Sequence, residues 1–312
     1  MKKLFILLTF LSTIAVVDAK KPESTDLDLR IGTYNIWSHQ ARASRIRKNN
    51  AAPERNWDTS KKAVAQHIIE LDCDIMALQE ITNVCYEDLT NLLKKGKGKK
   101  YAIWWENIYP EGMRQIGSAV LYNKKRFSLS QQKIYYFSPT PEVRSRGWDE
   151  KRFFRASLAT VVTEKASGRK FLLFAAHGPL AKEAKVHAGL LLVEFDKNYN
   201  TEALPTIALG DMNARPDGAF HKAMCAHYED CALVAKEKLG TPGTFNSYQG
   251  SEEILALPYR RIDHIYVHST DKGKFDVLKY EVNTKKFKIG GNMHYPSDHC
   301  PVVVDIKLKS TF

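Results

Sequence analysis

The chain has 312 residues, of which 47 are Lys or Arg and 35 are Asp or Glu, so its formal net charge is +12. Hydrophobic residues make up 44% and charged residues 26%, a composition that excludes a fully disordered chain and a fibrous repeat. Five cysteines in this length are too few for a disulfide framework, so the fold must rest on a hydrophobic core.

The first 19 residues have the pattern of a secretory signal peptide. Lys2 and Lys3 precede an apolar run over residues 4–17, and Val17 and Ala19 are small residues at positions −3 and −1 of a cleavage site. The run is shorter than the roughly 20 residues of a membrane-spanning helix, and no later segment is apolar enough to cross a membrane. We therefore expect cleavage after Ala19, a single domain over residues 20–312, a secreted or periplasmic product and no stable membrane insertion.

Short apolar runs rich in β-branched residues recur along the mature chain and predict strands that are buried on at least one face. Two helices are expected between them, one capped by Asp58 or Thr59 and carrying Leu71, the other over residues 182–195. Strands outnumber helices and do not alternate with them strictly, which favours two packed sheets covered by helices. The expected strands cover residues 29–34, 74–78, 119–122, 156–162, 171–176, 206–209, 262–267 and 301–306.

Polar side chains stand next to most of these strands. One polar strand end would mean little, because Asp and Asn are common in turns. Six ends that carry Glu, Asp, Asn and His together indicate a functional site built where strands meet at one edge. The residues are Asn35, Gln79-Glu80, His177, Asp211-Met212-Asn213, Asp263 and Asp298-His299.

The order of these motifs resembles the endonuclease/exonuclease/phosphatase superfamily, the group of deoxyribonuclease I and exonuclease III. The segment over residues 137–149 also looks like a secreted bacterial subgroup of that family. The resemblance implies an α/β fold: a four-layer sandwich of two central, mostly antiparallel sheets flanked by helices, forming one catalytic domain. The matching pieces are Thr33-Tyr34-Asn35-Ile36, Leu78-Gln79-Glu80, Ala176-His177, Gly210-Asp211-Met212-Asn213, Arg261-Ile262-Asp263 and Ser297-Asp298-His299.

The resemblance implies a metal site of Glu80 and Asn35, completed by Asp298 from the opposite sheet. Such oxygen ligands suit Mg²⁺, with Mn²⁺ as an alternative. Asp211 is then the group that orients or deprotonates the attacking water. Asn213 would hold a phosphate oxygen, pointing to the same side as Asp211 if this segment is extended.

The resemblance also implies two histidines at the scissile phosphate. His299 would act as a cation whose pKa is raised by Asp263. His177 would be the second imidazole, although the sequence offers no clear carboxylate to partner it. Arg152 and Arg155 are further candidates for phosphate contacts, with a surface or structural ion pair as the alternative.

Basic residues gather in three segments, 42–48, 94–100 and 144–155. Such clusters fit nucleic acid, anionic lipid headgroups or acidic glycans. Tyr101, Trp104 and Trp105 follow the second segment and fit either base stacking or a core strand. No protein partner is evident.

Together these patterns favour an exported, divalent-metal-dependent phosphoesterase, with a nuclease acting on DNA or RNA as the leading hypothesis because phosphate contacts dominate nucleic-acid affinity. The alternatives are a sphingomyelinase-like enzyme or a phosphatase for sugar or inositol phosphates on the same fold. A non-catalytic module that binds a polyanion is disfavoured because the implied site residues are all present.

The cysteines give little information about function. Cys225 and Cys231 are close enough in sequence to pair, whereas Cys73 and Cys300 have the context of small buried residues.

Overall fold

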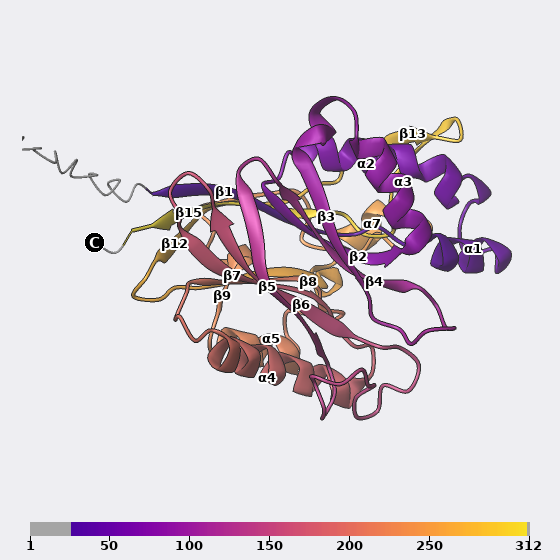
Figure 1. The fold of residues 1–312 in the computed structure, drawn as a ribbon. Helices are drawn as coiled ribbons and strands as arrows, with labels where there is room; N and C mark the ends of the chain where they lie inside the picture. Colours follow the sequence, from indigo (N-terminus) through magenta and orange to yellow (C-terminus); the bar gives the residue numbers. More distant parts are fainter. Residues whose placement is uncertain (1–25, 311–312) are drawn as a thin grey trace, which may run out of the picture.

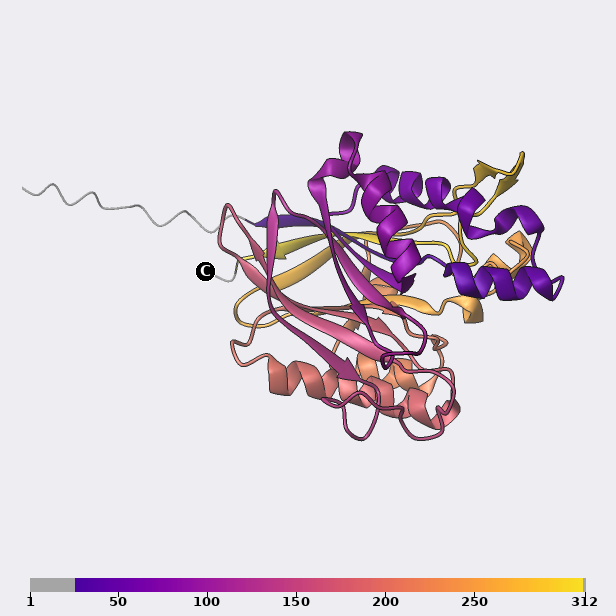
Figure 2. The same cartoon turned by 45° about the vertical axis from the view of Figure 1, so that its right-hand side comes forward.

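The computed structural model describes residues 26–310, so the expected signal peptide lies outside the described residues. Two β-sheets pack face to face, and helices cover the outer face of each (Figures 1 and 2). The prediction of a four-layer α/β sandwich is therefore confirmed.

The first sheet has seven strands in the order β10-β12-β15-β1-β2-β4-β3. β1 and β2 are parallel and are joined by helices, while β15 pairs with β1 and β4 with β2 in antiparallel fashion. The strands are β1 (Leu27–Asn35), β2 (Ile75–Thr82), β3 (Tyr101–Asn107), β4 (Ile116–Asn123), β10 (Glu237–Leu239), β12 (Lys274–Val282) and β15 (Val302–Lys309).

The second sheet has six strands in the order β5-β6-β7-β8-β11-β9. Here β7 and β8 are the parallel pair, joined by one helix, and β11 runs antiparallel to β8. The strands are β5 (Phe127–Tyr136), β6 (Ala156–Glu164), β7 (Lys170–His177), β8 (Thr206–Asp211), β9 (Glu229–Asp230) and β11 (Asp263–His268), and a separate hairpin consists of β13 (Phe287–Ile289) and β14 (Asn292–His294).

Both predicted helices are confirmed, as α2 and α4. The first begins after Asn56, whose side chain accepts the Thr59 N–H, so the expected cap at Asp58 or Thr59 is wrong by a few residues. The helices are α1 (His39–Arg47), α2 (Trp57–Leu71), α3 (Asn83–Leu93), α4 (Lys182–Tyr199), α5 (Ala219–Cys225), α6 (Cys231–Val234) and α7 (Glu252–Leu255), with 3-10 turns η1 (Pro53–Arg55), η2 (Gly96–Lys100) and η3 (Pro258–Arg260).

Three apolar layers hold the sandwich together. Ile31 and Leu209 belong to the core between the two sheets. Ile68 packs α2 onto the first sheet, and Leu192 packs α4 onto the second. Each fully buried side chain of this size contributes about 1.5–3 kcal/mol to folding.

All five cysteines are free, so the suggested pairing of Cys225 with Cys231 is wrong. Cys225 is exposed on α5, whereas Cys231 is buried at the start of α6. Cys73 and Cys300 are buried, as expected.

Within residues 26–310, none of the helices combines the length and the apolar character that a membrane span requires.

Candidate active site

The predicted site residues come together at one end of the sandwich. In the first sheet, the parallel pairing of β1 with β2 sets Asn35 beside Gln79. In the second sheet, His177 pairs with Asp211 at the ends of β7 and β8, and Asp263 faces Asp211 at the start of β11. The two parallel strand pairs therefore point their carboxyl ends at a shared space between the sheets.

Asp298 and His299 lie just before β15, which belongs to the first sheet. The expectation that Asp298 reaches the site from the opposite sheet is therefore wrong. Because β15 runs antiparallel to β1, its beginning lies beside the end of β1. Asp298 thus shares a sheet with Asn35 and Glu80.

A chain of hydrogen bonds orients His299. The hydroxyl of Thr244 donates to Oδ2 of Asp263 at 2.6 Å, and the same oxygen lies 2.8 Å from Nδ1 of His299. The other ring nitrogen, Nε2, then faces Oδ2 of Asp211 at 3.8 Å. The imidazole is held between two buried carboxylates.

This arrangement fixes the charges of the pair. Burial alone would lower the pKa of His299, but Asp263 and Asp211 outweigh it and raise the pKa to about 10. Burial alone would raise the pKa of Asp211, but the positive charge of His299 and hydrogen bonds hold it well below its usual range. At neutral pH His299 is therefore a cation and Asp211 an anion.

Two further contacts hold the Asp211 carboxylate. Nδ2 of Asn35 donates to Oδ2 at 2.9 Å, and the backbone N–H of Asn213 donates to Oδ1 at 2.9 Å. The preceding residue must be glycine, because a Cβ on Gly210 would lie 1.9 Å from the carbonyl oxygen of Ala176 and its φ is +151°. This close approach of β7 and β8 brings His177 next to Asp211.

Asn213 does not lie in an extended segment, so that expectation is wrong. β8 ends at Asp211, and Asn213 has a φ of 49° in the left-handed region. Its Nδ2 donates to the carbonyl oxygen of Gly178 at 3.0 Å. The Asn213 side chain thus connects the loop after His177 to the loop after Asp211.

Glu80 is aimed into the site by an irregularity of β2. Its φ is 60°, and the register between β2 and β4 shifts between Gln79 and Ile81. Such a bulge re-aims one side chain at a cost in backbone strain. The backbone N–H and the hydroxyl of Ser38 both donate to Oε2 of Glu80 at 3.1 Å.

The donor set beside Glu80 fits a hard divalent cation. Burial, together with the negative charge of Glu80, raises the pKa of Asp298 to about 6, although His299 acts in the other direction. A cation held by the two carboxylates would relieve that repulsion. Oδ1 of Asn35 accepts the Trp37 N–H at 3.0 Å and keeps a second lone pair, so the three residues could bind Mg²⁺ through oxygen.

His177 lies between a cation and a carboxylate. The Arg155 guanidinium contacts its Nε2, which also lies 3.4 Å from Oδ2 of Asp211. Burial, and then the charge of Arg155, lower the pKa of His177. Asp211, which acts in the other direction on this pKa, is the acidic neighbour that the sequence did not reveal for His177.

These residues line a cleft with a volume of about 620 Å³. The carboxylates that line it, Glu80, Asp211 and Asp298, belong to the site itself, and the other charged residues around them are Arg or Lys. Arg152 is exposed at the rim, whereas Arg155 is 9% exposed. The basic lining residues are Arg45, Arg47, Lys48, Arg114, Arg152, Arg155 and Arg260.

The basic segments of the sequence occupy different positions in the structure. Within residues 42–48, Arg42 is fully buried and donates to backbone carbonyls, including those of Trp37 and Arg55, while its basic neighbours line the cleft. Residues 94–100 lead into β3, whose first residue pairs with Asn123 at the end of the first sheet away from Glu80. This lysine-rich segment is therefore not part of the cleft.

Tyr101, Trp104 and Trp105 lie in β3, an edge strand of the first sheet, and pack against hydrophobic core clusters, which favours the strand alternative for them. Trp105 stacks on Tyr86 of α3, and its Nε1 donates to the carbonyl of Ile81 at 3.1 Å.

Ser38 and Thr244 contact the site but were not among the sequence candidates. A signal existed for Ser38, because its hydroxyl also accepts the Ala41 N–H at the start of α1. No local signal existed for Thr244, because its partner Asp263 is 19 residues away in the chain.

Comparisons with known proteins show which family this chain resembles. A family model described as Endonuclease/Exonuclease/phosphatase family matches residues 32–299. An uncharacterized protein, L388 of Acanthamoeba polyphaga mimivirus, is 26% identical over 258 residues, which cover 80% of this chain and 91% of the viral protein.

Two solved structures share the fold. A mannosyl-6-phosphatase of Bacteroides thetaiotaomicron superposes with a TM-score of 0.74 at 24% identity, covering 89% of this chain and 99% of that one. The D. rerio TDP2 in complex with a single-strand DNA product superposes with a TM-score of 0.64 at 17% identity, covering 89% and 98%.

Proposed function

The chain belongs to the Endonuclease/Exonuclease/phosphatase family, whose members hydrolyse phosphoester bonds, and from this premise we propose that it is a divalent-metal-dependent nuclease. The observation that supports the chemistry is the buried Asp263–His299–Asp211 arrangement beside the carboxylates of Glu80 and Asp298. It combines an anion that can take a proton, a cation for a phosphoryl oxygen and oxygen ligands for a metal.

In this mechanism Asp211 orients the attacking water and accepts its proton. Asn35 and the Asn213 N–H hold both carboxylate oxygens, so the acceptor is fixed before substrate binds. His299 stays protonated and donates from Nε2 to a phosphoryl oxygen as negative charge develops there.

Arg155 supplies a second fixed positive charge beside the same space. Its guanidinium rests on neutral His177, which leaves the remaining N–H groups for a phosphate oxygen. A Mg²⁺ ion held by Glu80, Asp298 and Asn35 would add charge neutralisation at the phosphoryl and leaving oxygens.

The walls of the cleft favour nucleic acid as substrate. Each Arg or Lys that lines the cleft adds positive potential around the catalytic carboxylates. Such a potential suits a substrate that carries further phosphate groups besides the one at the cleaved bond. Phe153 and Tyr248 also line the cleft. Arg45 lies over the Tyr248 ring, and Arg152 and Arg155 lie over the Phe153 ring, so aromatic rings and positive charges alternate on the cleft wall.

A second candidate, a phosphatase for sugar phosphates, is favoured by the size of the cleft. Its volume of about 620 Å³ suits a small ligand. One structural relative is described as a mannosyl-6-phosphatase. A sphingomyelinase-like activity has no comparable observation in its favour.

We also propose that the protein is exported and cleaved after Ala19. The support is the sequence pattern of residues 1–19 alone. Mass spectrometry of the protein from its native host tests this, and an intact Met1 in the abundant form would contradict it.

The first experiment measures phosphate-ester cleavage by the mature chain with Mg²⁺ and with EDTA. The substrates are single- and double-stranded DNA, RNA, hexose 6-phosphates, inositol phosphates and sphingomyelin. The matched control is Asp211→Asn, which keeps the size of the side chain and removes the proton acceptor. We expect Mg²⁺-dependent cutting of nucleic acid, reduced about 10²–10⁴-fold in the control.

The outcomes separate the candidates. Release of phosphate from a hexose phosphate, without cutting of nucleic acid, would replace the nuclease by the phosphatase. Turnover that persists in EDTA or in Asp211→Asn would contradict the mechanism for both.

A further inference from the structure

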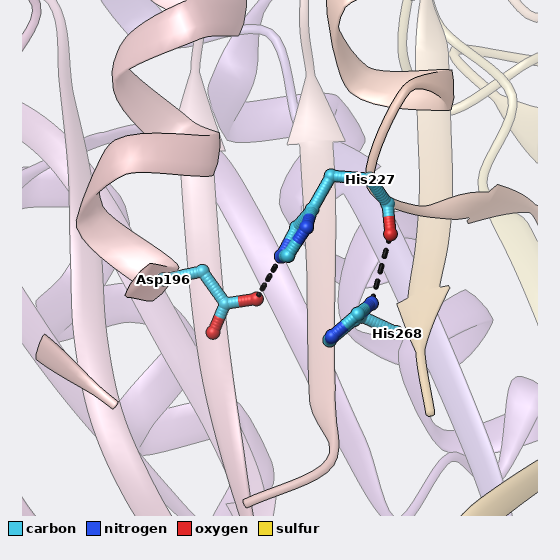
Figure 3. Close-up of side chains that lie close together, drawn as sticks. All are labelled: Asp196, His227 and His268. Carbon is cyan, nitrogen blue, oxygen red and sulfur yellow. Dashed lines mark hydrogen bonds and ion pairs between the residues drawn. The ribbon is translucent and has the colours of Figure 1, made fainter. Parts of the chain in front are cut away.

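Three side chains with metal-ligating atoms gather far from the catalytic cleft. Asp196 lies near the end of α4, His227 in the turn between α5 and β9, and His268 at the last position of β11. One ligand atom from each lies within 4.8 Å of the other two, and Figure 3 shows the carboxylate and the two rings facing one space. Asp263 is at the other end of β11, so a strand length of roughly 17 Å separates this cluster from the active site.

The contacts of His268 determine its protonation. Its Nδ1 lies 2.8 Å from the carbonyl oxygen of His227, as the dashed line in Figure 3 marks. Because a carbonyl only accepts, Nδ1 must carry the proton, and in the neutral ring Nε2 then holds a lone pair. A histidine that ligates a metal is commonly fixed in this way, with its second nitrogen donating to a backbone carbonyl.

Asp196 is held by contacts that leave one oxygen for the cluster. Its side chain is 2% exposed; Oδ1 accepts from Thr206 at 2.8 Å and from Asn200 at 3.1 Å. The other oxygen, Oδ2, lies 3.0 Å from Nε2 of His227.

The two rings lie against each other. They stack with centroids 4.0 Å apart and an angle of 21° between their planes, beside one carboxylate. Both histidines are half-buried, so solvent can reach the open side of the cluster.

We propose that Asp196, His227 and His268 bind a borderline divalent transition ion of the Zn²⁺ class, with water in the fourth position. Two imidazoles and a carboxylate are the donors that Zn²⁺ prefers. Tetrahedral ligation places donor atoms roughly 3.3 Å apart with bonds of about 2.0–2.1 Å. The two stacked rings must therefore turn out of their parallel arrangement until both Nε2 lone pairs point at the ion. His227 would move its proton to Nδ1 and offer Nε2 to the ion.

A second cluster of metal-ligating side chains does not fit a metal ion. His221, Asp230 and His264 also bring ligand atoms together, but Arg261 donates to Oδ2 of Asp230 at 2.7 Å. The guanidinium already occupies the place of a cation there, and it would repel a metal ion. That group is a buried polar network.

Metal at the Asp196 site would join three segments that are distant in sequence. The ion would connect α4 and the turn after α5 to the end of β11, a strand of the second sheet. A ligand that binds only the folded chain raises its stability. We therefore expect zinc to act on stability rather than on the chemical step.

The experiment isolates this site from the catalytic one. The mature chain carrying Glu80→Gln, which removes a carboxylate of the cleft, is dialysed against buffered Zn²⁺ with excess Mg²⁺, and bound zinc is measured by elemental analysis. We expect one equivalent of zinc and a rise in Tm of about 5 °C when free zinc is a hundredfold above its Kd. Adding His268→Gln or His227→Gln should remove both effects.

His187→Gln is the matched control, because His187 lies on α4 but stacks on Trp148, outside the cluster. Its zinc content and Tm shift should equal those of the parent. Less than half an equivalent of zinc in the parent, or zinc retained in both cluster variants, would overturn the proposal. If neither cluster variant folds, a parent chain without bound zinc still overturns the proposal.

Discussion

Ser38 donates two hydrogen bonds to one oxygen of Glu80, from its backbone N–H and from its hydroxyl. Thr244 acts similarly on Asp263, which in turn holds His299. At the scale of residues, the site thus depends on small hydroxyl side chains that fix the carboxylates. Such supporting contacts commonly change metal affinity by 10–100-fold when they are lost.

We predict that Ser38→Ala weakens Mg²⁺ activation about tenfold, because Glu80 loses one of two donors that hold Oε2 in place. The measurement is the Mg²⁺ concentration that gives half-maximal activity on whichever phosphoester proves to be turned over. Ser44→Ala, on α1 and in the lining of the same cleft, is the control and should leave that concentration unchanged. Equal Mg²⁺ requirements for wild type and Ser38→Ala would show that Ser38 does not act through the metal.

At the scale of elements, the loop between β5 and β6 shapes the cleft, and two neighbouring carboxylates, Asp149 and Glu150, fasten it. Oε1 of Glu150 accepts the N–H groups of Arg152 and Phe153 at 3.2 and 3.3 Å. Oε2 accepts those of Leu180 and Ala181 at 2.9 and 3.3 Å. Glu150 therefore connects the segment that leads to Arg155 with the loop that follows His177.

We predict that Glu150→Ala lowers the free energy of unfolding by about 2 kcal/mol, because a buried carboxylate and its four backbone donors lose one another. KM should also rise, since Arg155 loses its fixed support. Urea unfolding and steady-state kinetics measure the two effects. Glu142→Ala, an exposed change on the same loop, should alter neither. An unchanged KM in Glu150→Ala would separate the loop from substrate binding.

The sequence predicts the elements of this fold better than it predicts their contacts. Alternating and continuous apolar runs mark the strands, and the polar residues at their ends mark the site, because both are local patterns. The bulge at Glu80, the left-handed turn at Asn213 and the sheet to which Asp298 belongs depend on which strands pair. The contact of His177 with Arg155 joins two neighbouring strands, and no local residue pattern encodes it.

At the scale of the whole molecule, charge and function are unevenly distributed along the sandwich. One end holds the cleft with its basic walls, and the lysine-rich segment over residues 94–100 lies at the other. The outer helical layer contains a titratable group that is not part of the cleft, the imidazole of His67. His67 lies in α2 and packs against Tyr34 of β1 and Phe287 of β13, so it joins a helix, the first sheet and the hairpin.

The buried position of His67 makes the stability of the molecule depend on pH. Burial lowers its pKa to about 4, although the contact of Nε2 with Oδ1 of Asn283 at 2.9 Å acts in the other direction. The unfolded chain, with an imidazole pKa of about 6.5, takes up the proton at higher pH than the folded chain does. Stability contributed by neutral His67 is therefore present above about pH 6.5 and is lost as the pH falls toward 4.

We predict that His67 accounts for a loss of about 2 kcal/mol in unfolding free energy between pH 7 and about pH 4.5. His67→Gln keeps a donor for Asn283 but cannot be protonated, so its stability should fall by that much less over the same interval. Urea unfolding of both proteins at the two pH values measures the difference. Other buried groups titrate equally in both proteins and cancel. An identical loss of unfolding free energy in wild type and variant would contradict this prediction. It would mean that His67 is as easily protonated in the folded chain as in the unfolded one, because the outer layer at α2 opens to water before the sandwich unfolds.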